Sequence, residues 1–376
     1  GYLKMSNNKK APAIRFKGFN DDWEERKLGE VGTDIIAGGD IEKNKIKDSG
    51  KYPVIANALT NDGIVGYYEE EFRIKAPAVT VTGRGDVGHA KARNINFTPV
   101  VRLLSITSNH DVNFLENAIN NISVMVESTG VPQLTVPQLE KYKISIPNNP
   151  GEEEAIGILF IKFDNLITLQ KRRCDKLILL KKAMLEQMFP KGKKSIPEIR
   201  FKDFNDDWEE RKLGEVAERF DNLRIPVTES NRVKGVTPYY GANGILDYVD
   251  GFTHDGEFIL IAEDGANDLN NYPVHYVSGK VWVNNHAHVI QAKEGIADNK
   301  FLRYSFKTFN IEPYLVGGSR AKLNANIMMD LDINTPPLGE QFKIGEFFRT
   351  LDHLITLQKR KLEKLKVVKK SMLDKM

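Results

Sequence analysis

The sequence has a single cysteine and no long apolar run. Because Cys174 stands alone among 376 residues, no disulfide can form within the chain, and no zinc site of the cysteine type is expected. This use of cysteine is typical of a reducing compartment. No apolar segment approaches the ~20 residues of a membrane-spanning helix. The first residues, GYLKM, lack the pattern of a secretion signal, and we expect Gly1–Lys4 to be an added segment before a native Met5.

Signatures of catalysis are also scarce. The sequence contains no G-x-x-x-x-G-K-[ST] phosphate loop and no G-x-S-x-G elbow. Residues 83–88 match the spacing G-x-G-x-x-G, but no helical pattern follows them, so the strand–turn–helix context of a dinucleotide site is missing. The Asn- or Asp-Pro-Pro-aromatic motif of an amino-methyltransferase is missing too. His286 and His288 would share one face of a strand, but without a third ligand cluster this pair favours hydrogen bonding over metal binding. The sequence therefore favours a binding protein, without a metal, over an enzyme.

One 18-residue phrase occurs twice, almost unchanged. Residues 14–31 read IRFKGFNDDWEERKLGEV, and residues 199–216 repeat it with one difference, Gly18 against Asp203. A second phrase, DNLITLQKRR from Asp164, returns as DHLITLQKRK from Asp352. The repeats indicate two copies of one unit, in agreement with a length typical of two domains. Such a duplication predicts pseudo-twofold symmetry, which suits a symmetric or bipartite partner.

The net charge of +3 is unevenly distributed. Residues 160–194 contain ten Lys and Arg against three Asp and Glu, and residues 346–376 contain nine against four. These segments therefore carry +7 and +5, which leaves −9 on the rest of the chain. Such basic segments suit nucleic acid or an acidic partner, but Lys and Arg that solvate long exposed helices would explain them equally well.

The pattern of short apolar runs predicts an α+β fold. Strand-like runs separated by Gly, Asn and Asp turns lie at residues 78–82, 100–104, 258–262, 280–283 and 289–290. Residues 113–119 and 301–306 suit short helices. We expect two repeated mixed α/β domains, over residues 12–152 and 197–338, joined by two long antiparallel helices over residues 153–190 and 339–376.

The two long helices are predicted from apolar residues at alternating spacings of three and four. The expected seams are Phe163, Leu166, Gln170, Arg173, Leu177, Leu180 and Met184 in the first helix, and Leu351, Leu354, Gln358, Lys361, Leu365, Val368 and Met372 in the second. A helix with such a stripe is not stable alone in water, so the two must pack on each other or on partner helices. The candidates for partner docking are Leu166, Gln170, Leu177, Leu180, Met184, Leu354, Gln358, Leu365 and Met372.

The polar loops of the two domains differ, although the phrases that frame them hardly differ. Arg84 lies between two glycines, where the backbone can approach another molecule closely. Arg and Asn side chains form the bidentate pairs that distinguish guanine and adenine edges, whereas an ordinary hairpin loop is the alternative. The candidate DNA contacts are Asn57, Thr82, Arg84, Lys91, Arg93, Gln133, Tyr240, Asn243, Asn267, Arg320, Lys322 and Asn324.

Over nearly its whole length the sequence resembles the specificity (S) subunit of type I restriction-modification systems. The residues that carry the resemblance are WEERKLGE at 23–30 and 208–215, YGANG at 240–244, GKVWVNNHAHV at 279–289, and LITLQKR in both helical segments. The first domain departs from the second. It has Ile55-Ala56-Asn57 where the second has Tyr240-Gly241-Ala242, and it has no His-Ala-His phrase.

The resemblance implies a non-catalytic, bacterial, cytoplasmic subunit that recognises double-stranded DNA. Each of its two target-recognition domains would read one half of a split sequence, and the helices would act as spacer and docking surface for two methyltransferase (M) subunits. Restriction (R) subunits could join the complex. S-adenosylmethionine, ATP and Mg²⁺ would belong to these partner subunits, and no cofactor is expected in this chain.

Two other functions are compatible with the residues. A scaffold whose duplicated heads bind protein would show no sequence-dependent DNA affinity and little loss of binding with salt, whereas a DNA reader must lose affinity as salt rises. An enzyme acting alone is disfavoured by the missing motifs, and it would require methyl transfer or cleavage by the purified chain.

Overall fold

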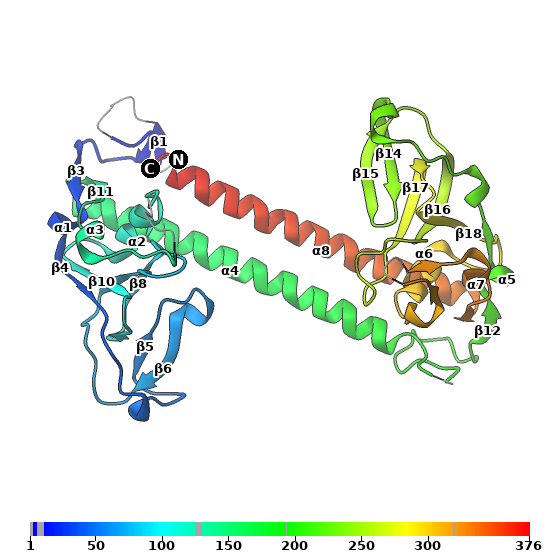
Figure 1. The fold of residues 1–376 in the computed structure, drawn as a ribbon, viewed down its shortest axis with the longest axis horizontal. Helices are drawn as coiled ribbons and strands as arrows, with labels where there is room; N and C mark the ends of the chain where they lie inside the picture. The colour runs from blue at the N-terminus through cyan, green and yellow to red at the C-terminus, as the bar shows by residue number, and fades with distance from the viewer. Residues whose placement is uncertain (1–2, 6–10, 125–129, 193, 319–320) are drawn as a thin grey trace. The chain divides into compact units, whose positions relative to one another are not determined.

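The chain folds into two compact units. The computed structural model describes residues 3–5, 11–124, 130–192, 194–318 and 321–376. The first unit comprises residues 1–171 and 360–376, and the second comprises residues 172–359. Two long helices, α4 (Pro150–Gln187) and α8 (Leu338–Leu373), contribute to both units (Figure 1). The part of each unit outside these helices is called its head. Within the described residues, no helix combines the length and the apolar character needed to cross a membrane.

The first head is built on a four-stranded antiparallel sheet in the order β4-β10-β7-β8. These strands are β4 (Gly32–Ala37), β10 (Leu104–Ser108), β7 (Ala78–Val81) and β8 (Ala90–Arg93). A smaller sheet has the order β6 (Ile64–Tyr68), β5 (Tyr52–Ile55) and β9 (Thr98–Pro99), in which β5 and β9 are parallel. Two further pairs are β3 (Trp23–Lys27) with β11 (Lys143–Pro147), and β1 (Leu3–Met5) with β2 (Ile14–Phe16).

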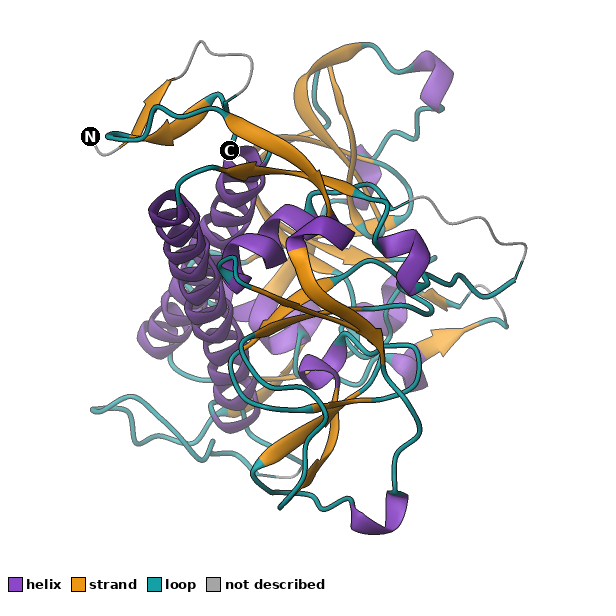
Figure 2. Cartoon of the chain, turned by 90° about the vertical axis from the view of Figure 1, so that its left-hand side faces the viewer, coloured by secondary structure: helices purple, strands orange, loops and turns teal. Residues whose placement is uncertain are grey.

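Helix α2 covers the core of the first head. It spans Val112–Asn120, and the carboxylate of Asp111 accepts hydrogen bonds from the N–H groups of Asn113 and Phe114 at its start. Its buried residues pack with strand β7, whose sequence Ala-Val-Thr-Val is wholly buried and rich in β-branched residues. The short helices α1 (Leu28–Val31) and α3 (Val136–Leu139) complete the head. Figure 2 looks onto this unit, with its strands in orange and its helices in purple.

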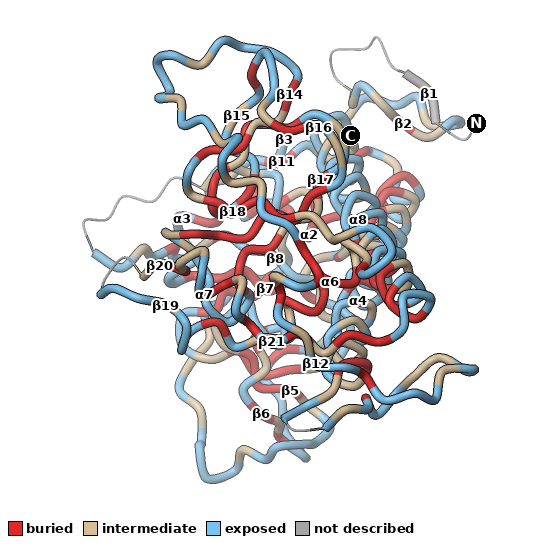
Figure 3. The backbone as a smooth tube through the Cα atoms, turned by 90° about the vertical axis from the view of Figure 1, so that its right-hand side faces the viewer, coloured by how far each residue is buried: buried red, intermediate tan, exposed pale blue. Residues whose placement is uncertain are grey.

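The second head repeats this arrangement with longer strands. Its six-stranded sheet has the order β13 (Ala217–Arg219), β18 (Ala287–Ala292), β16 (His254–Ala262), β17 (Val274–Val283), β14 (Lys234–Gly241) and β15 (Gly244–Val249). The short pairs are β12 (Glu209–Lys212) with β21 (Asp332–Thr335), and β19 (Leu315–Val316) with β20 (Lys322–Leu323). The helices are α5 (Leu213–Val216), α6 (Asn299–Phe306) and α7 (Ala325–Met329). Figure 3 shows that buried residues follow β16, β17 and β18.

The hydrogen bonds of the two heads establish which residues are equivalent. Leu134 N–H donates to Gly83 O at 2.9 Å in the first head, and Leu323 N–H donates to Glu263 O at 2.7 Å in the second. Strand β5 pairs in parallel with β9, just as β14 pairs in parallel with β17. The ten-residue strand β17 therefore corresponds to both β8 and β9, which are separate strands in the first head. The expected α+β fold with two repeated domains is confirmed.

One expected strand is misplaced. Residues 100–104 were predicted to form a strand, but β10 begins only at Leu104. The reason is that Arg102 has a φ of 68°, in the left-handed region, which interrupts an extended chain. The apolar residues Val100 and Val101 precede this turn, and Val101 is exposed.

The long helices run antiparallel within each unit. In the first unit the Lys369 ammonium lies 2.6 Å from the Asp164 carboxylate. In the second unit Lys181 lies 2.5 Å from Asp352. The start of one helix therefore lies beside the end of the other in both units, as the sequence predicted.

The buried stripe of each helix is rotated from the expected seam. The expected positions Leu166, Arg173, Leu180, Leu354, Lys361 and Val368 are exposed. The positions one residue later are partly or fully buried: Ile167, Cys174, Lys181, Ile355, Leu362 and Lys369. The expected seam was wrong at these alternate layers because two adjacent heptad frames are almost equally apolar, and the ion pairs of Lys181 and Lys369 select the second frame.

Candidate nucleic-acid interface

The loop that follows β7 in the first head is folded tightly upon itself. Thr82 is 6% exposed, and its hydroxyl donates to Asp86 O and accepts from His89 N–H at 3.0 Å. Gly85 and Gly88 have φ values of 77° and 85°, which glycine adopts without strain. Thr82 therefore shapes the loop rather than presenting its hydroxyl to a ligand.

Three polar residues from separate segments have their backbones close together at this loop. Arg84 and Gln133 form an isolated bridge between their backbones, and both residues are exposed. A Cβ built on Gly83 would lie 2.2 Å from Arg102 O, so the segment that carries Arg102 approaches closely as well. Arg102 is exposed and was not among the predicted contacts, because its turn conformation is not readable from the sequence. Arg84, Arg102 and Gln133 are called the first reading group.

Asn57 supports the first reading group from behind. Its side-chain oxygen accepts from Gly83 N–H at 2.7 Å, and its amide nitrogen donates to Val101 O at 3.1 Å. Both ends of the amide thus hold the backbone next to Arg84 and Arg102. Although it was predicted as a candidate DNA contact, Asn57 is placed as a residue that positions the loop.

Lys91 and Arg93 of β8 line a different feature, a cavity of about 340 Å³ whose lining includes Thr80, Thr82 and His89. Arg93 donates to the Thr80 hydroxyl at 3.0 Å and to Asp62 O at 2.9 Å. Burial lowers the pKa of Arg93, although the carboxylates of Asp62 and Glu116 oppose that shift. Lys91 lies 3.7 Å from Glu116 and is half exposed, which leaves it available to an acidic ligand.

The second head holds different side chains at the equivalent positions. Asp264 and Lys322 form the bridge that Arg84 and Gln133 form in the first head. The Nδ1 atom of His286 lies 2.6 Å from the Asp264 carboxylate, and the strand register makes His286 the counterpart of Arg102. Asp264, His286 and Lys322 are called the second reading group. The equivalent backbone positions thus hold two Arg and a Gln in the first head, and an Asp, a His and a Lys in the second.

Asn243 makes a similar clamp, but both of its hydrogen bonds go to a single loop. Its amide nitrogen donates to Gly265 O at 2.9 Å, and its oxygen accepts from Asn267 N–H at 3.0 Å. The side chain of Asn267 remains exposed beside this clamp. Asn324 precedes α7, where its carbonyl oxygen accepts from Met328 N–H at 2.9 Å. Arg320, another predicted contact, lies outside the described residues.

Tyr240 lies near a half-buried histidine at the end of β14. Its ring lies 6.4 Å from that of His275, and burial raises the pKa of the Tyr240 hydroxyl. Burial together with Lys307 and Arg303 lowers the pKa of His275 to about 4, so this imidazole is neutral at pH 7.

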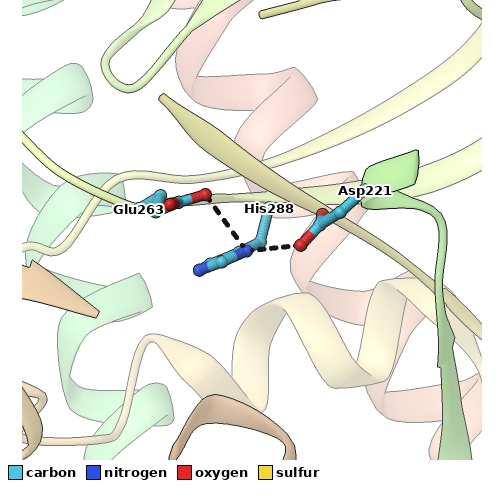
Figure 4. Close-up of side chains that lie close together, drawn as sticks. All are labelled: Asp221, Glu263 and His288. Carbon is cyan, nitrogen blue, oxygen red and sulfur yellow. Dashed lines mark hydrogen bonds and ion pairs between the residues drawn. The ribbon is translucent and has the colours of Figure 1, made fainter. Parts of the chain in front are cut away.

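A buried charge network anchors the second reading group (Figure 4). His288 Nδ1 lies 2.7 Å from Asp221 and 3.5 Å from Glu263, and its Nε2 faces Leu323 O at 2.8 Å. Glu263 also lies 2.6 Å from both Arg224 and Lys322. Burial favours the neutral acids, but hydrogen bonds outweigh it and lower the pKa of Asp221 and Glu263.

The same three groups, Asp221, Glu263 and His288, have ligand atoms within 4.8 Å of one another, the spacing that a metal ion would need. A cation would have to displace Arg224 and Lys322 from Glu263, and both ring nitrogens of His288 already face oxygen atoms. The arrangement therefore fits a charge-balanced network that fixes Lys322 next to Asp264.

Each unit also presents an equivalent apolar stripe on its long helices. In the first unit it consists of Leu166, Leu169, Val367 and Val368, which are between 39% and 66% exposed. In the second unit the residues 188 positions away in the repeat, Leu354, Leu357, Leu179 and Leu180, are between 37% and 68% exposed. Two such matched surfaces suit two copies of one partner.

The predicted docking residues divide between this surface and the interior. Leu166, Leu180 and Leu354 belong to the exposed stripes. Gln170 is 3% exposed, and Leu177, Gln358 and Leu365 are half-buried. Met184 and Met372 pack against the cores of the second and first units, respectively. The residues with exposed side chains are the better candidates for contact with a partner.

Solved structures share the fold. A type I restriction-modification system S subunit from M. genitalium aligns with a TM-score of 0.71 and 17% identity, covering 96% of each chain. A structure described as the structural basis of complex assembly and conformational transition of the type I R-M system aligns with a TM-score of 0.53 and 16% identity. At these identities the likeness establishes the fold alone.

Sequence comparison identifies the family. A putative type I restriction enzyme specificity subunit from Haemophilus influenzae is 47% identical over 145 residues, which span 39% of this chain and only 37% of that relative. Another putative type I restriction enzyme specificity subunit, from Methanocaldococcus jannaschii, is 24% identical over 94% of this chain and 92% of the relative. The family model described as type I restriction modification DNA specificity domain matches residues 20–203 and 205–367. With two copies of this domain over most of its length, the chain belongs to the type I restriction-modification DNA specificity family.

Proposed function

We propose that the chain is the non-catalytic DNA-recognition subunit of a type I restriction-modification complex, in which each head reads one half of a bipartite target. The observation that carries this proposal is the contrast between the two reading groups. Arg84, Arg102 and Gln133 occupy the same frame as Asp264, His286 and Lys322. Two heads that recognise two different DNA sequences need the same backbone structure with different polar side chains, and this is the arrangement found here.

The chemistry of each reading group suits the major groove. Arg forms bidentate hydrogen bonds with guanine, and Gln does so with adenine. Asp accepts from the amino group of cytosine, whereas Lys donates to guanine. The clamps made by Asn57 and Asn243 hold the backbone of the loops that carry Arg84 and Asp264, which reduces the entropy lost on binding.

We further propose that the apolar stripes dock two methyltransferase subunits and that the helices set the distance between the half-sites. The supporting observation is that the stripes recur at the repeat offset, so one partner surface fits both. Methyl transfer from S-adenosylmethionine, ATP-driven translocation and cleavage would be carried out by the partner M and R subunits, with Mg²⁺.

The decisive experiment is to express the chain with its cognate methyltransferase subunit and to map methylated adenines by long-read sequencing. A split motif with a fixed spacer supports the proposal. Binding of the complex to that motif should weaken steeply as salt rises, because phosphate contacts release counterions. Affinity that depends on neither DNA sequence nor salt would favour the alternative, a scaffold whose heads bind protein.

A further inference from the structure

The first unit contains an open apolar pocket of about 430 Å³ beside the end of α8. Its apolar lining includes Trp23, Phe114, Ile156, Phe160, Leu373 and Met376. Residues 373–375 are held there, because Ile14 N–H donates to Lys375 O at 3.0 Å and the Asn121 amide donates to Leu373 O at 3.3 Å. The pocket is larger than the roughly 150 Å³ apolar cavity that suffices to bind benzene.

The second unit provides the same site with its occupant in place. Trp208, Phe301 and Phe348 are the counterparts of Trp23, Phe114 and Phe160, by the repeated phrases and by the equivalent caps of α2 and α6. The Trp and Phe rings meet edge to face in both units, at 6.0 Å and 76° in the first and at 5.8 Å and 67° in the second. Ile199 N–H donates to Gln187 O at 2.9 Å, which reproduces the contact between Ile14 and Lys375.

Phe189 fills the pocket of the second unit. Its ring lies 5.9 Å from Trp208, 5.7 Å from Phe301 and 6.1 Å from Phe348, and the residue is 5% exposed. Phe189 directly follows Met188, the counterpart of Met376. Phe189, one residue after this methionine, thus forms a cluster of four aromatic rings with Trp208, Phe301 and Phe348.

Trp23 and Trp208 differ in burial because only the second pocket is filled by an aromatic ring. Trp208 is 3% exposed under Phe189, whereas Trp23 is only half-buried. Asn117 stands in the first unit where the second has Tyr304, whose ring lies 5.0 Å from Phe348. The smaller Asn117 widens the first pocket further, so the space is sufficient for a whole ring.

We propose that this pocket is a binding site for an aromatic side chain presented directly after Met376, in the place that Phe189 takes in the second unit. The ring would stack between Trp23, Phe114 and Phe160 and would hold the end of α8 against the first head. An aromatic side chain buries about 150–250 Å² and prefers the edge-to-face partners that this pocket offers. The occupant is therefore defined by chemistry and by position, independently of what the heads bind.

The test compares two extensions of the full chain. Phe–Pro is added after Met376, in the order of Phe189 and Pro190, and Ala–Pro is the matched control. Calorimetric unfolding and hydrogen exchange of residues 366–376 are measured. The Phe–Pro chain should unfold roughly 3–8 °C higher than the Ala–Pro chain, as expected for burial of one ring in a domain of this size, and its helix end should exchange more slowly.

Two further variants locate the effect in the pocket. Ala118→Met fills the site from α2, so the advantage of Phe–Pro over Ala–Pro should disappear in that background. Phe189→Leu should speed exchange at residues 184–189, because it removes the ring that contacts Trp208, Phe301 and Phe348 in the equivalent site. If the Phe–Pro and Ala–Pro chains unfold and exchange alike, or if the gain persists with Ala118→Met, the proposal is wrong and the pocket takes another occupant, such as a partner or a second copy.

Discussion

Lys181 of α4 pairs with Asp352 of α8 at 2.5 Å, and the same pair recurs with the helices exchanged, as Lys369 with Asp164 at 2.6 Å. Lys181 and Lys369 are related by the 188-residue offset of the repeat, and so are Asp164 and Asp352, which makes each ion pair the pseudo-symmetric image of the other. Their surroundings differ, however. Tyr304 also donates to Asp352, at 2.7 Å, and Arg303 lies 3.3 Å away.

We expect Asp352→Asn to destabilise the second unit by about 1–3 kcal/mol at neutral pH, because it leaves Lys181 and Arg303 without their shared anion. Asp164→Asn is the matched control. Its carboxylate is 43% exposed, against 28% for Asp352, so the loss should stay below about 1 kcal/mol. Thermal and urea unfolding measure both variants, and equal losses would contradict the difference in environment.

The contribution of Asp352 should depend on pH. Burial would raise its pKa, but the hydrogen bonds from Lys181 and Tyr304 outweigh burial and lower it. A carboxylate with a lowered folded pKa stabilises the fold fully above its unfolded pKa of about 3.9, and loses that contribution as the pH falls through the folded value. The gap between wild type and Asp352→Asn should therefore narrow in acid. A gap that widens below pH 4 would refute this assignment.

Arg84→Ala should weaken binding to the cognate target by roughly 1–3 kcal/mol and relax specificity at one base of the first half-site. Arg26→Ala removes the same charge from β3, where Arg26 pairs with Glu24, and serves as the control. Fluorescence titration of matched and single-mismatch duplexes by the complex with its methyltransferase measures both effects. Unchanged binding by Arg84→Ala would mean that Arg84 is only a loop residue.

A chimera that carries residues 199–336 in both halves tests whether the heads read different sequences. The methylated motif should become a near-palindrome of the second half-site, because both reading groups would then contain Asp264, His286 and Lys322. Methylome sequencing of cells that express the chimera with the methyltransferase gives the answer. An unchanged motif would exclude separate reading by the two heads.

The helices are expected to set the spacer. Seven residues inserted after Gln170 and seven after Gln358 preserve the heptad phase and lengthen each helix by about 10.5 Å, or about three base pairs. We expect the same half-sites with a spacer longer by about two to four base pairs, although rotation around the duplex will reduce activity. An insertion in one helix alone is the control and should disrupt the pairing of the helices. Full activity on targets with the parental spacer would show that the length of the helices does not set the distance between the half-sites.

The apolar stripes predict the stoichiometry of assembly. Leu169→Lys and Leu357→Lys alter equivalent positions of the two units, which are 47% and 43% exposed. Each single variant should bind one methyltransferase subunit, and the double variant none, because a buried lysine opposes an apolar interface. Val236→Lys, a change at a 90% exposed position in the second head, is the control. Native mass spectrometry counts the subunits, and two bound subunits in the double variant would place docking elsewhere.

The duplication and the long helices could be predicted from the sequence because both are periodic patterns. The phase of the seam could not, since its layers disagree: Cys174 beside Arg173 favours the second frame, whereas Leu180 beside Lys181 favours the first. In the structure the ion pairs of Lys181 and Lys369 belong to the second frame. Periodicity thus establishes that a helix has a buried face, while partners in space decide which face it is.

The reading groups were predictable only in part. Arg84, Gln133 and Lys322 were recognised from their residue types and polar loops, and the structure places Arg84 beside Gln133. Arg102 was missed because its left-handed φ carries no sequence signature. Asn57 and Asn243 were assigned to DNA contact because an amide suits a base edge, yet the same chemistry suits the backbone of a neighbouring loop, which is where their hydrogen bonds go.

Arg84 and Asp264 occupy one position of a shared frame with opposite charges, and this has a consequence for orientation. Two chemically identical heads would allow the subunit to sit on its target in either of two directions with equal energy. If the heads read DNA as proposed, a cation in one head and an anion in the other remove that degeneracy, because a guanine edge attracts the first and repels the second. Under this proposal a protein with two nearly identical halves would bind in one direction only and would distinguish the two ends of an asymmetric DNA sequence.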